Sequence, residues 1–212
     1  MTLLLFVFAC LFALAAQTIQ LFSEQKYQLL KSQYGQQVTN RLDDWKILVE
    51  QNQNKSETEK LHLVNDFFNQ KIRWVDDKKL WKQRDYWATP LESLTKGAGD
   101  CEDFSIAKYY TLHALGLPIN KLKITYVKAL EYNQAHMVLT YYASKKSEPL
   151  ILDNINKKIL KGSKREDLKP VYSFNGEGMW ISKQKKLGKK VGSSQRIRLW
   201  TDLVTRINKE LE

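Results

Sequence analysis

Cys101 is the residue of this chain best placed to act as a nucleophile, because the sequence around it predicts the start of a helix. Gly97-Ala98-Gly99 is typical of a loop, and from Cys101 to about Leu115 the apolar residues recur at helical spacing. A thiol at a helix N-terminus meets unpaired backbone N–H groups and the positive end of the helix dipole, and both favour the thiolate. Since the thiolate attacks carbonyl carbon atoms, the expected chemistry is nucleophilic catalysis.

A histidine and an aspartate follow Cys101 in the order that such chemistry needs. Of the three histidines, two fall in predicted helices, whereas His136 begins a predicted strand and is the best candidate for a general base. Asp153 interrupts the apolar run Leu150–Ile155, so its carboxylate needs a partner within a largely buried sheet. If these two strands form a hairpin, His136 and Asp153 come within a few residues of register. The three residues would then form a papain-like triad in which Asp153 holds the imidazole tautomer.

Three carboxylates surround Cys101 in the sequence, namely Asp100, Glu102 and Asp103. Their negative charge opposes the thiolate unless a cation or strong hydrogen-bond donors compensate it. Two interpretations are open at this point. Asp100 could cap the helix with two ordinary first-turn acids behind it, which is a common pattern, or the three acids could form a cation site. The residues taken alone favour the helix-cap interpretation.

Residues 1–16 predict export from the cytoplasm. The run from Leu3 to Ala16 has no charged residue, is short for a spanning helix, which needs about 20 apolar residues, and has the length of a signal-peptide core. Ala13-Leu14-Ala15 offers a cleavage site, but no Lys or Arg precedes the run, so an uncleaved N-terminal anchor is the alternative. Once the segment is removed, Cys101 is the only cysteine of the mature chain. A lone thiol is unusual in an oxidising compartment and supports a reactive role.

Length and composition limit the fold. The 212 residues are 43% hydrophobic and 27% charged, which predicts one globular domain over residues 22–212 after the leader. Two cysteines exclude a disulfide-stapled mini-protein, and the lack of a second long apolar run in the sequence excludes a multi-span membrane protein.

Hydrophobic periodicity predicts an α+β fold, in which a helical N-terminal part packs on an antiparallel sheet. Ser56 is a good N-cap for the second helix, and Asn175-Gly176 suits the type I′ turn of a hairpin. In chain order, the expected elements are helices over 22–54 and 57–75, a long structured loop over 74–99, the helix of Cys101, strands over Lys123–Leu130, His136–Ala143, Leu150–Ile155, Val171–Phe174 and Met179–Ser182, and a helix from about Ser194.

The region around Cys101 resembles the bacterial transglutaminase-like cysteine proteinases, which include periplasmic proteases of the LapG type. The resemblance covers about residues 60–185, and it implies a papain-like, transglutaminase-like fold with a triad of Cys101, His136 and Asp153. The motifs that carry it are Arg73-Trp74, Leu80-Trp81, Asp85-Tyr86-Trp87-Ala88-Thr89-Pro90, Gly97-Ala98-Gly99-Asp100-Cys101-Glu102-Asp103, Ile106-Ala107-Lys108-Tyr109, His136-Met137-Val138-Leu139 and Leu152-Asp153-Asn154.

The same resemblance implies a calcium ion beside the nucleophile, which would answer the conflict of charges around the thiol. Asp100 and Glu102 match the acidic motif of the family best, and Asp103 is the weaker candidate. Carboxylates suit a hard cation that prefers oxygen ligands. With the resemblance taken into account, we expect calcium rather than a simple helix cap.

The function that the resemblance implies is endoproteolysis of a large surface adhesin near its N-terminus, in the periplasm, which releases the adhesin and promotes biofilm dispersal. The implied partners are the adhesin as substrate and an inner-membrane cyclic-di-GMP receptor that sequesters the protease. Two alternatives from other classes are a transglutaminase-type acyltransferase, in which an amine replaces water, and a non-catalytic binding module of the same fold. Cys, His and Asp in the right order argue against the second alternative.

Positive charge is concentrated in the C-terminal part of the chain. From Asn156 onward, 15 Lys+Arg oppose 6 Asp+Glu and supply +9 of the net charge of +11, with the highest density from Lys183 to Lys190. A nucleic-acid-binding protein carries such charge, but export argues against nucleic acid as a partner. The simplest interpretation is a solvated basic face. A sharper expectation is that this region contacts an acidic partner or the anionic membrane surface.

Overall fold

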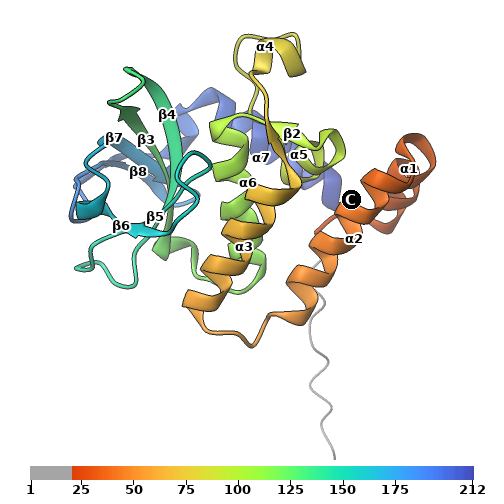
Figure 1. Ribbon diagram of the computed structural model, residues 1–212, viewed down its shortest axis with the longest axis horizontal. Coiled ribbons are helices and arrows are strands. Elements are labelled where there is room, and N and C mark those ends of the chain that lie inside the picture. The colour runs from red at the N-terminus through yellow and green to blue at the C-terminus, as the bar shows by residue number, and fades with distance from the viewer. Residues whose placement is uncertain (1–20) are drawn as a thin grey trace, which may run out of the picture.

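The computed structural model describes residues 21–212, so the leader expected over 1–16 lies outside the described residues. The described chain forms a helical half and a sheet half, with helix α6 (Cys101–Ala114) between them (Figure 1). This arrangement confirms the expected α+β fold. Within residues 21–212, no helix is long and apolar enough to cross a membrane.

The helical half follows the predicted spacing but is divided differently. Gly35 has a φ of 74°, which ends the first helix, so the single helix expected over 22–54 is two helices. Ser56 caps the next helix as expected, and its hydroxyl and the Glu59 carboxylate form a capping box. The final helix begins at Arg198, after a 3₁₀ turn, rather than at about Ser194. These helices are α1 (Glu24–Tyr34), α2 (Gln36–Gln51), α3 (Glu57–Lys71) and α7 (Arg198–Leu211).

The segment expected as a loop over 74–99 contains short elements of its own. Thr89 caps a helix with Pro90 in its first turn, and a capping box with Glu92 completes the start. Sequence periodicity missed this helix because seven residues make barely two turns. The elements are β1 (Arg73–Trp74), α4 (Asp77–Leu80), α5 (Pro90–Lys96) and β2 (Ala98–Gly99), and β1 pairs with β2 in parallel.

Helix α6 is buried on nearly all sides, as an element between two layers must be. Phe104, Ile106 and Leu112 are each at most 5% exposed, and the helix packs against α3 on one side and β4 on the other. Gly116, with a φ of 85°, follows its C-terminal end, as the sequence predicts. The helix that begins at Cys101 is therefore held rigidly by both halves of the molecule.

The sheet has seven antiparallel strands in the order β6-β5-β4-β3-β7-β8-β9. The expected pairing of the His136 strand with the Asp153 strand is confirmed, because Leu139 lies opposite Leu152. The two edge strands β6 and β9 were not predicted, since strands of two or three residues carry little pattern. The strands are β3 (Leu122–Ala129), β4 (Gln134–Tyr141), β5 (Leu150–Leu152), β6 (Leu160–Lys161), β7 (Leu168–Asn175), β8 (Gly178–Ile181) and β9 (Lys190–Gly192).

The expected hairpin of β7 and β8 is present, but its turn is not the predicted one. Asn175 pairs with Gly178, so the two turn residues are Gly176 and Glu177, and neither has the positive φ that a type I′ turn requires. Asn175 instead stabilises this turn through hydrogen bonds of its side chain. Its amide donates to the carbonyl oxygens of Ile119 and Leu122, and its Oδ1 accepts the N–H of Glu177. Asn175 thus ties the end of the sheet to the turn before β3.

Candidate active site

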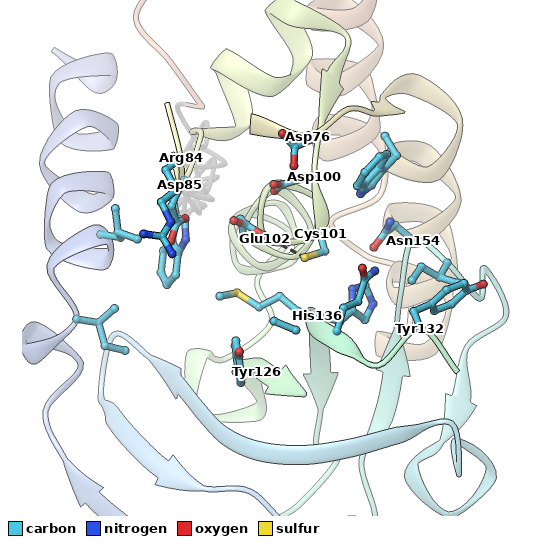
Figure 2. A pocket seen from close by; sticks show the side chains of 18 of the residues that line it. Asp76, Arg84, Asp85, Asp100, Cys101, Glu102, Tyr126, Tyr132, His136 and Asn154 are labelled. Atoms are coloured by element: carbon cyan, nitrogen blue, oxygen red, sulfur yellow. Dashed lines mark hydrogen bonds between the residues drawn. The ribbon is translucent and has the colours of Figure 1, made fainter. Parts of the chain in front are cut away.

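Cys101 is the first residue of α6 and lies in a cleft of about 920 Å³ (Figure 2). The loop before it is held by the pairing of Trp74 with Gly99. A side chain at Gly99 would come within 2.6 Å of the Asp103 carboxylate, so only glycine lets the chain pass so close to the helix. The sequence therefore places a free thiol at the rim of a large cleft, on a helix that cannot easily move.

His136 projects into the same cleft from β4, and Asp153 follows the end of β5 directly. The His136 Nε2 atom lies 2.8 Å from Oδ1 of Asp153, and both side chains are almost completely buried. Because an ionised carboxylate only accepts hydrogen bonds, Nε2 is the donor in this contact, and Nδ1 is the ring nitrogen that does not contact Asp153. The structure thus brings together Cys101, His136 and Asp153, the three residues that the sequence predicts for a triad.

The negative charge of Asp153 is compensated by a residue that the sequence analysis missed. Arg165, which is 1% exposed, donates from Nη2 to Oδ2 of Asp153 at 2.7 Å, and it also pairs with Asp167. Burial alone would raise the pKa of Asp153, but the hydrogen bond from His136 and the charge of Arg165 together hold that pKa well below its usual range. Asp153 is therefore ionised wherever the protein is folded near neutral pH.

A second buried cation, Lys108, connects the nucleophile helix to the same aspartate. Its Nζ donates to the backbone oxygen of Asp153 at 3.0 Å and to the side-chain oxygens of Asn65 and Asn69 on α3, each at 2.9 Å. Burial lowers the pKa of Lys108 to about 7, although the charge of Asp153 opposes this. Lys108 lies two helical turns after Cys101, so one helix carries the nucleophile and the group that holds the aspartate in place.

The other side of Cys101 is acidic. Asp100 and Glu102 meet Asp77 of α4 and Asp85 of the following loop, and carboxylate oxygens of these residues come within 4.8 Å of one another in overlapping groups. Burial, with the charge of Glu102, raises the pKa of Asp100 to about 10, and burial raises that of Asp77 to about 6. Burial also raises the pKa of Asp85, and the charge of Glu102 and a hydrogen bond with it act in the same direction. So much negative charge is not stable in one place without a cation or bound protons.

Two carboxylate oxygens of this cluster indicate whether a cation would fit there. Oδ1 of Asp77 and Oδ1 of Asp100 are buried and accept no hydrogen bond. Buried polar atoms are almost always satisfied, so two such oxygens in one acidic cluster are what a hard cation would use. The residues present therefore fit a calcium ion. Asp77 and Asp85 lie more than 15 residues before Cys101, in a segment of many charges, and although Asp85 opens one of the motifs of the resemblance, the sequence does not mark either residue as a metal ligand.

Asp103, the third acid beside Cys101 in sequence, is engaged differently. It is fully buried, and its two oxygens accept the backbone N–H groups of Ala88 at 2.7 Å and of Asp100 at 3.2 Å. Burial raises its pKa as well. Asp103 thus anchors the loop before α5 and the start of α6, and it has less free oxygen to offer a metal than its neighbours.

The charge imbalance acts directly on the nucleophile. The Cys101 thiol donates to Oε2 of Glu102 at 3.0 Å, and burial together with Glu102 and Asp100 raises the pKa of Cys101 well above its usual value. The backbone N–H of Met137 acts in the opposite direction. The helix N-terminus alone does not make Cys101 a thiolate, because two neighbouring carboxylates outweigh it.

Comparison with known proteins decides the family. Residues 36–185 match the model of the bacterial transglutaminase-like cysteine proteinases. The chain belongs to this family. No curated protein matches the chain. In this transglutaminase-like cysteine proteinase, Cys101 is the first residue of helix α6, as the motifs predict.

Solved structures of another family member are similar along nearly the whole chain. LapG of Legionella pneumophila is 43% identical, with 87% of this chain and 95% of that chain covered at a TM-score of 0.76. An EGTA-treated form of the same protein gives a TM-score of 0.75. Its calcium-bound form is 44% identical over 86% of this chain and 98% of that chain, at a TM-score of 0.74. Calcium therefore binds to a proteinase that shares this fold and more than two fifths of its sequence.

Proposed function

We propose that this chain is a calcium-dependent cysteine endoprotease that acts in the periplasm on the N-terminal region of a large surface adhesin. One observation carries the protease part of the proposal. A free cysteine at a helix N-terminus shares a cleft with a histidine whose far nitrogen is held by a buried, ionised aspartate. This is the arrangement of a thiol protease, and it agrees with membership of the cysteine proteinase family.

The reaction uses these groups in sequence. Nδ1 of His136 takes the proton of the Cys101 thiol, and the thiolate attacks the scissile carbonyl carbon. The imidazolium that forms is stabilised by Asp153, whose low pKa keeps it charged. His136 then gives its proton to the leaving amine, and the acyl group stays on the sulfur. A water molecule, deprotonated by His136, releases the acyl group and restores the thiol.

We propose that Asp100 and Glu102 hold calcium together with Asp77, and that Asp85 lies close enough to contribute. Asp103, which the sequence also suggests as a ligand, has an oxygen within 4.8 Å of Asp77 and Asp100, but both of its oxygens accept backbone N–H groups and so orient the loop. A bound calcium ion would neutralise the carboxylates that oppose ionisation of the thiol. The calcium-bound LapG of Legionella supports this cofactor.

The biological role rests on the resemblance to the family rather than on the site. We propose that cleavage releases the adhesin and promotes biofilm dispersal, and that an inner-membrane cyclic-di-GMP receptor restrains the protease by binding it. The basic C-terminal region is a candidate surface for an acidic partner or for the anionic membrane. Gln184, in the densest part of this region, donates to the carbonyl oxygens of Gly162 and Arg165 and so holds this segment against that turn. Nucleic acid is not an expected partner of a periplasmic enzyme.

The test is a cleavage assay with the mature protein and the N-terminal region of a large adhesin from the same organism. Calcium and EGTA are compared in parallel, with the Cys101→Ala protein as control. A discrete cut that needs both Cys101 and calcium supports nucleophile, substrate class and cofactor together. If no cut occurs but a labelled amine is incorporated into protein, the enzyme is an acyltransferase. If neither product forms, the binding-module alternative gains support.

A further inference from the structure

Three large apolar side chains stand exposed at the cleft that holds Cys101. Trp74, Tyr132 and Ile155 are 60%, 57% and 44% exposed, and all three line this cleft. They come from β1, from the turn between β3 and β4, and from the chain after β5, so no local pattern gathers them. Exposed apolar groups that are brought together from distant segments mark a binding surface.

The adjacent strand β4 offers backbone groups along the same cleft. It pairs with β3 from Gln134 to Tyr141, whereas β5 covers only Leu139 to Tyr141. The first half of β4, from Gln134 to Val138, therefore pairs with no second strand, and Gln134 to Met137 line the cleft. Gln134 and Ala135 are exposed, whereas the N–H of Met137 contacts the Cys101 sulfur. Extended peptides bind unpaired strand edges by adding a strand: backbone hydrogen bonds provide affinity, and side-chain pockets provide selectivity.

The two ends of the cleft differ in chemistry. Asp85 and Glu102 lie on one side of Cys101, and Tyr132 and Asn154 lie on the other (Figure 2). An apolar substrate side chain is excluded from the acidic side by the cost of desolvating carboxylates. Its favourable position is the side of Tyr132, where the free edge of β4 leads away from the nucleophile.

We propose that Trp74, Tyr132 and Ile155 form a subsite for a large apolar side chain of an extended peptide that lies along the free edge of β4. The proposal deepens the proposed protease function and rests on it. A strand advances about 3.3 Å per residue, and two residues of β4, Gln134 and Ala135, separate His136 from the turn that carries Tyr132. The apolar substrate residue is therefore expected about two to four residues from the scissile bond.

A peptide library tests this subsite. The mature protein with calcium is incubated with a mixture of diverse peptides, and the cuts are mapped by mass spectrometry. We expect large apolar residues to be enriched about two to four positions from the cut, on one side only. Tyr132→Ala and Ile155→Ser should lower kcat/KM for such peptides by about 10- to 100-fold, mainly through KM, and should leave peptides with Ala at that position nearly unaffected.

Matched controls lie outside the cleft. Tyr34 and Ile181 are 49% and 51% exposed and do not line it, so Tyr34→Ala and Ile181→Ser remove similar surface elsewhere. Both control proteins should cleave the peptides with the same kcat/KM and the same apolar preference as the unmodified protein. An apolar preference that survives in both Tyr132→Ala and Ile155→Ser overturns the subsite, even if cleavage itself is confirmed.

A binding measurement separates this proposal from the protease function. The Cys101→Ala protein is probed with an array of peptides in which one position is varied, with and without Tyr132→Ala added. Apolar-selective binding that Tyr132→Ala weakens supports the subsite, even when the unmodified protein cuts nothing and the protease function fails. Binding without an apolar preference, or no binding to the array, overturns the subsite.

Discussion

The His136 side of Cys101 carries its own compensating charge, and the acidic side does not. Asp153 is buried but meets His136 and Arg165, and its pKa falls. Asp100 is partly buried, but its neighbours are carboxylates and its pKa rises to about 10. The pKa values of the two aspartates thus move in opposite directions, because the sign of the neighbouring charge decides which form is stable.

This difference shows which carboxylates of the site are satisfied by the protein and which need a ligand. On the triad side, the buried carboxylate oxygens of Asp153 accept hydrogen bonds from His136, Arg165 and the backbone N–H of Ile155. On the acidic side, two buried carboxylate oxygens accept none. The first region can orient a histidine by itself, whereas the second is built to receive a cation.

The largest expected effect is at the thiol that both regions share. Cys101→Ala should lower the cleavage rate by at least ~10³-fold, since no other nucleophile lies at the start of α6. The thiol has two hydrogen-bond partners, the Glu102 carboxylate and the backbone N–H of Met137, so the unfolding temperature should change little. Cleavage assays and thermal unfolding check both statements. Residual cleavage near the original rate would mean that another group attacks the substrate.

Removing the positive charge that compensates Asp153 should lower both the stability and the activity of the protein. Arg165→Met leaves the buried charge of Asp153 with one partner fewer, and loss of a buried partner typically costs 3–5 kcal/mol, here taken as about 3 kcal/mol. Denaturant unfolding and kcat/KM are the measurements. Arg198→Met is the matched control, because Arg198 forms an ion pair with Asp202 at the surface. The two side chains are 92% and 58% exposed, respectively, so the pair contributes about 1 kcal/mol or less. Equal losses in the two variants would contradict the comparison.

The uncompensated side should respond to calcium. Calcium at about 100 times its Kd stabilises a protein that binds it only when folded by about 2.7 kcal/mol, which raises Tm by roughly 5–10 °C for a chain of this size. Asp100→Asn and Glu102→Gln should lose this rise and the calcium dependence of cleavage. Asp202→Asn, on the exposed face of α7, should keep both. A full calcium response in Asp100→Asn would exclude the proposed ligands.

The smallest effect is a dependence on pH that has opposite signs in the two regions. In calcium-free protein, the folded pKa values of Asp100 and Asp77 are about 10 and about 6, above the ordinary 3.8. The folded state then holds protons that the unfolded chain releases, so these groups lower stability as pH rises above about 4. Asp153 has the opposite effect on stability. Its stabilising contribution is present above its unfolded pKa and is lost only as pH falls through its lower folded pKa.

Thermal unfolding at about pH 5 and about pH 8, with calcium and with EGTA, measures this balance. The gain in Tm from calcium should be larger at the higher pH, because bound calcium holds the carboxylates in the ionised form. Asp100→Asn should remove most of the difference between the two pH values in EGTA. A calcium gain that is equal at both pH values would contradict the raised pKa of Asp100.

Much of the catalytic side could be predicted from the sequence because its signals are local. The start of α6 is marked by glycines before Cys101, its end by Gly116, and the strands of His136 and Asp153 by β-branched residues. The order of these elements in a short antiparallel meander then brings the two side chains together, since Leu139 opposite Leu152 leaves few other registers. The type of turn at Asn175 and the short helices before Cys101 were not predictable in this way.

The tertiary structure alone decided what surrounds these three residues. Arg165 reaches Asp153 through a loop, and Asp77 reaches Asp100 from a four-residue helix. Neither position has a spacing that a sequence pattern could detect, because loops are placed by the elements that they connect. The sequence by itself predicted Cys101, His136 and Asp153 as the residues of the proposed triad. The fold decided which charges are compensated, which carboxylates stay open to a cation, and which apolar side chains meet at the cleft.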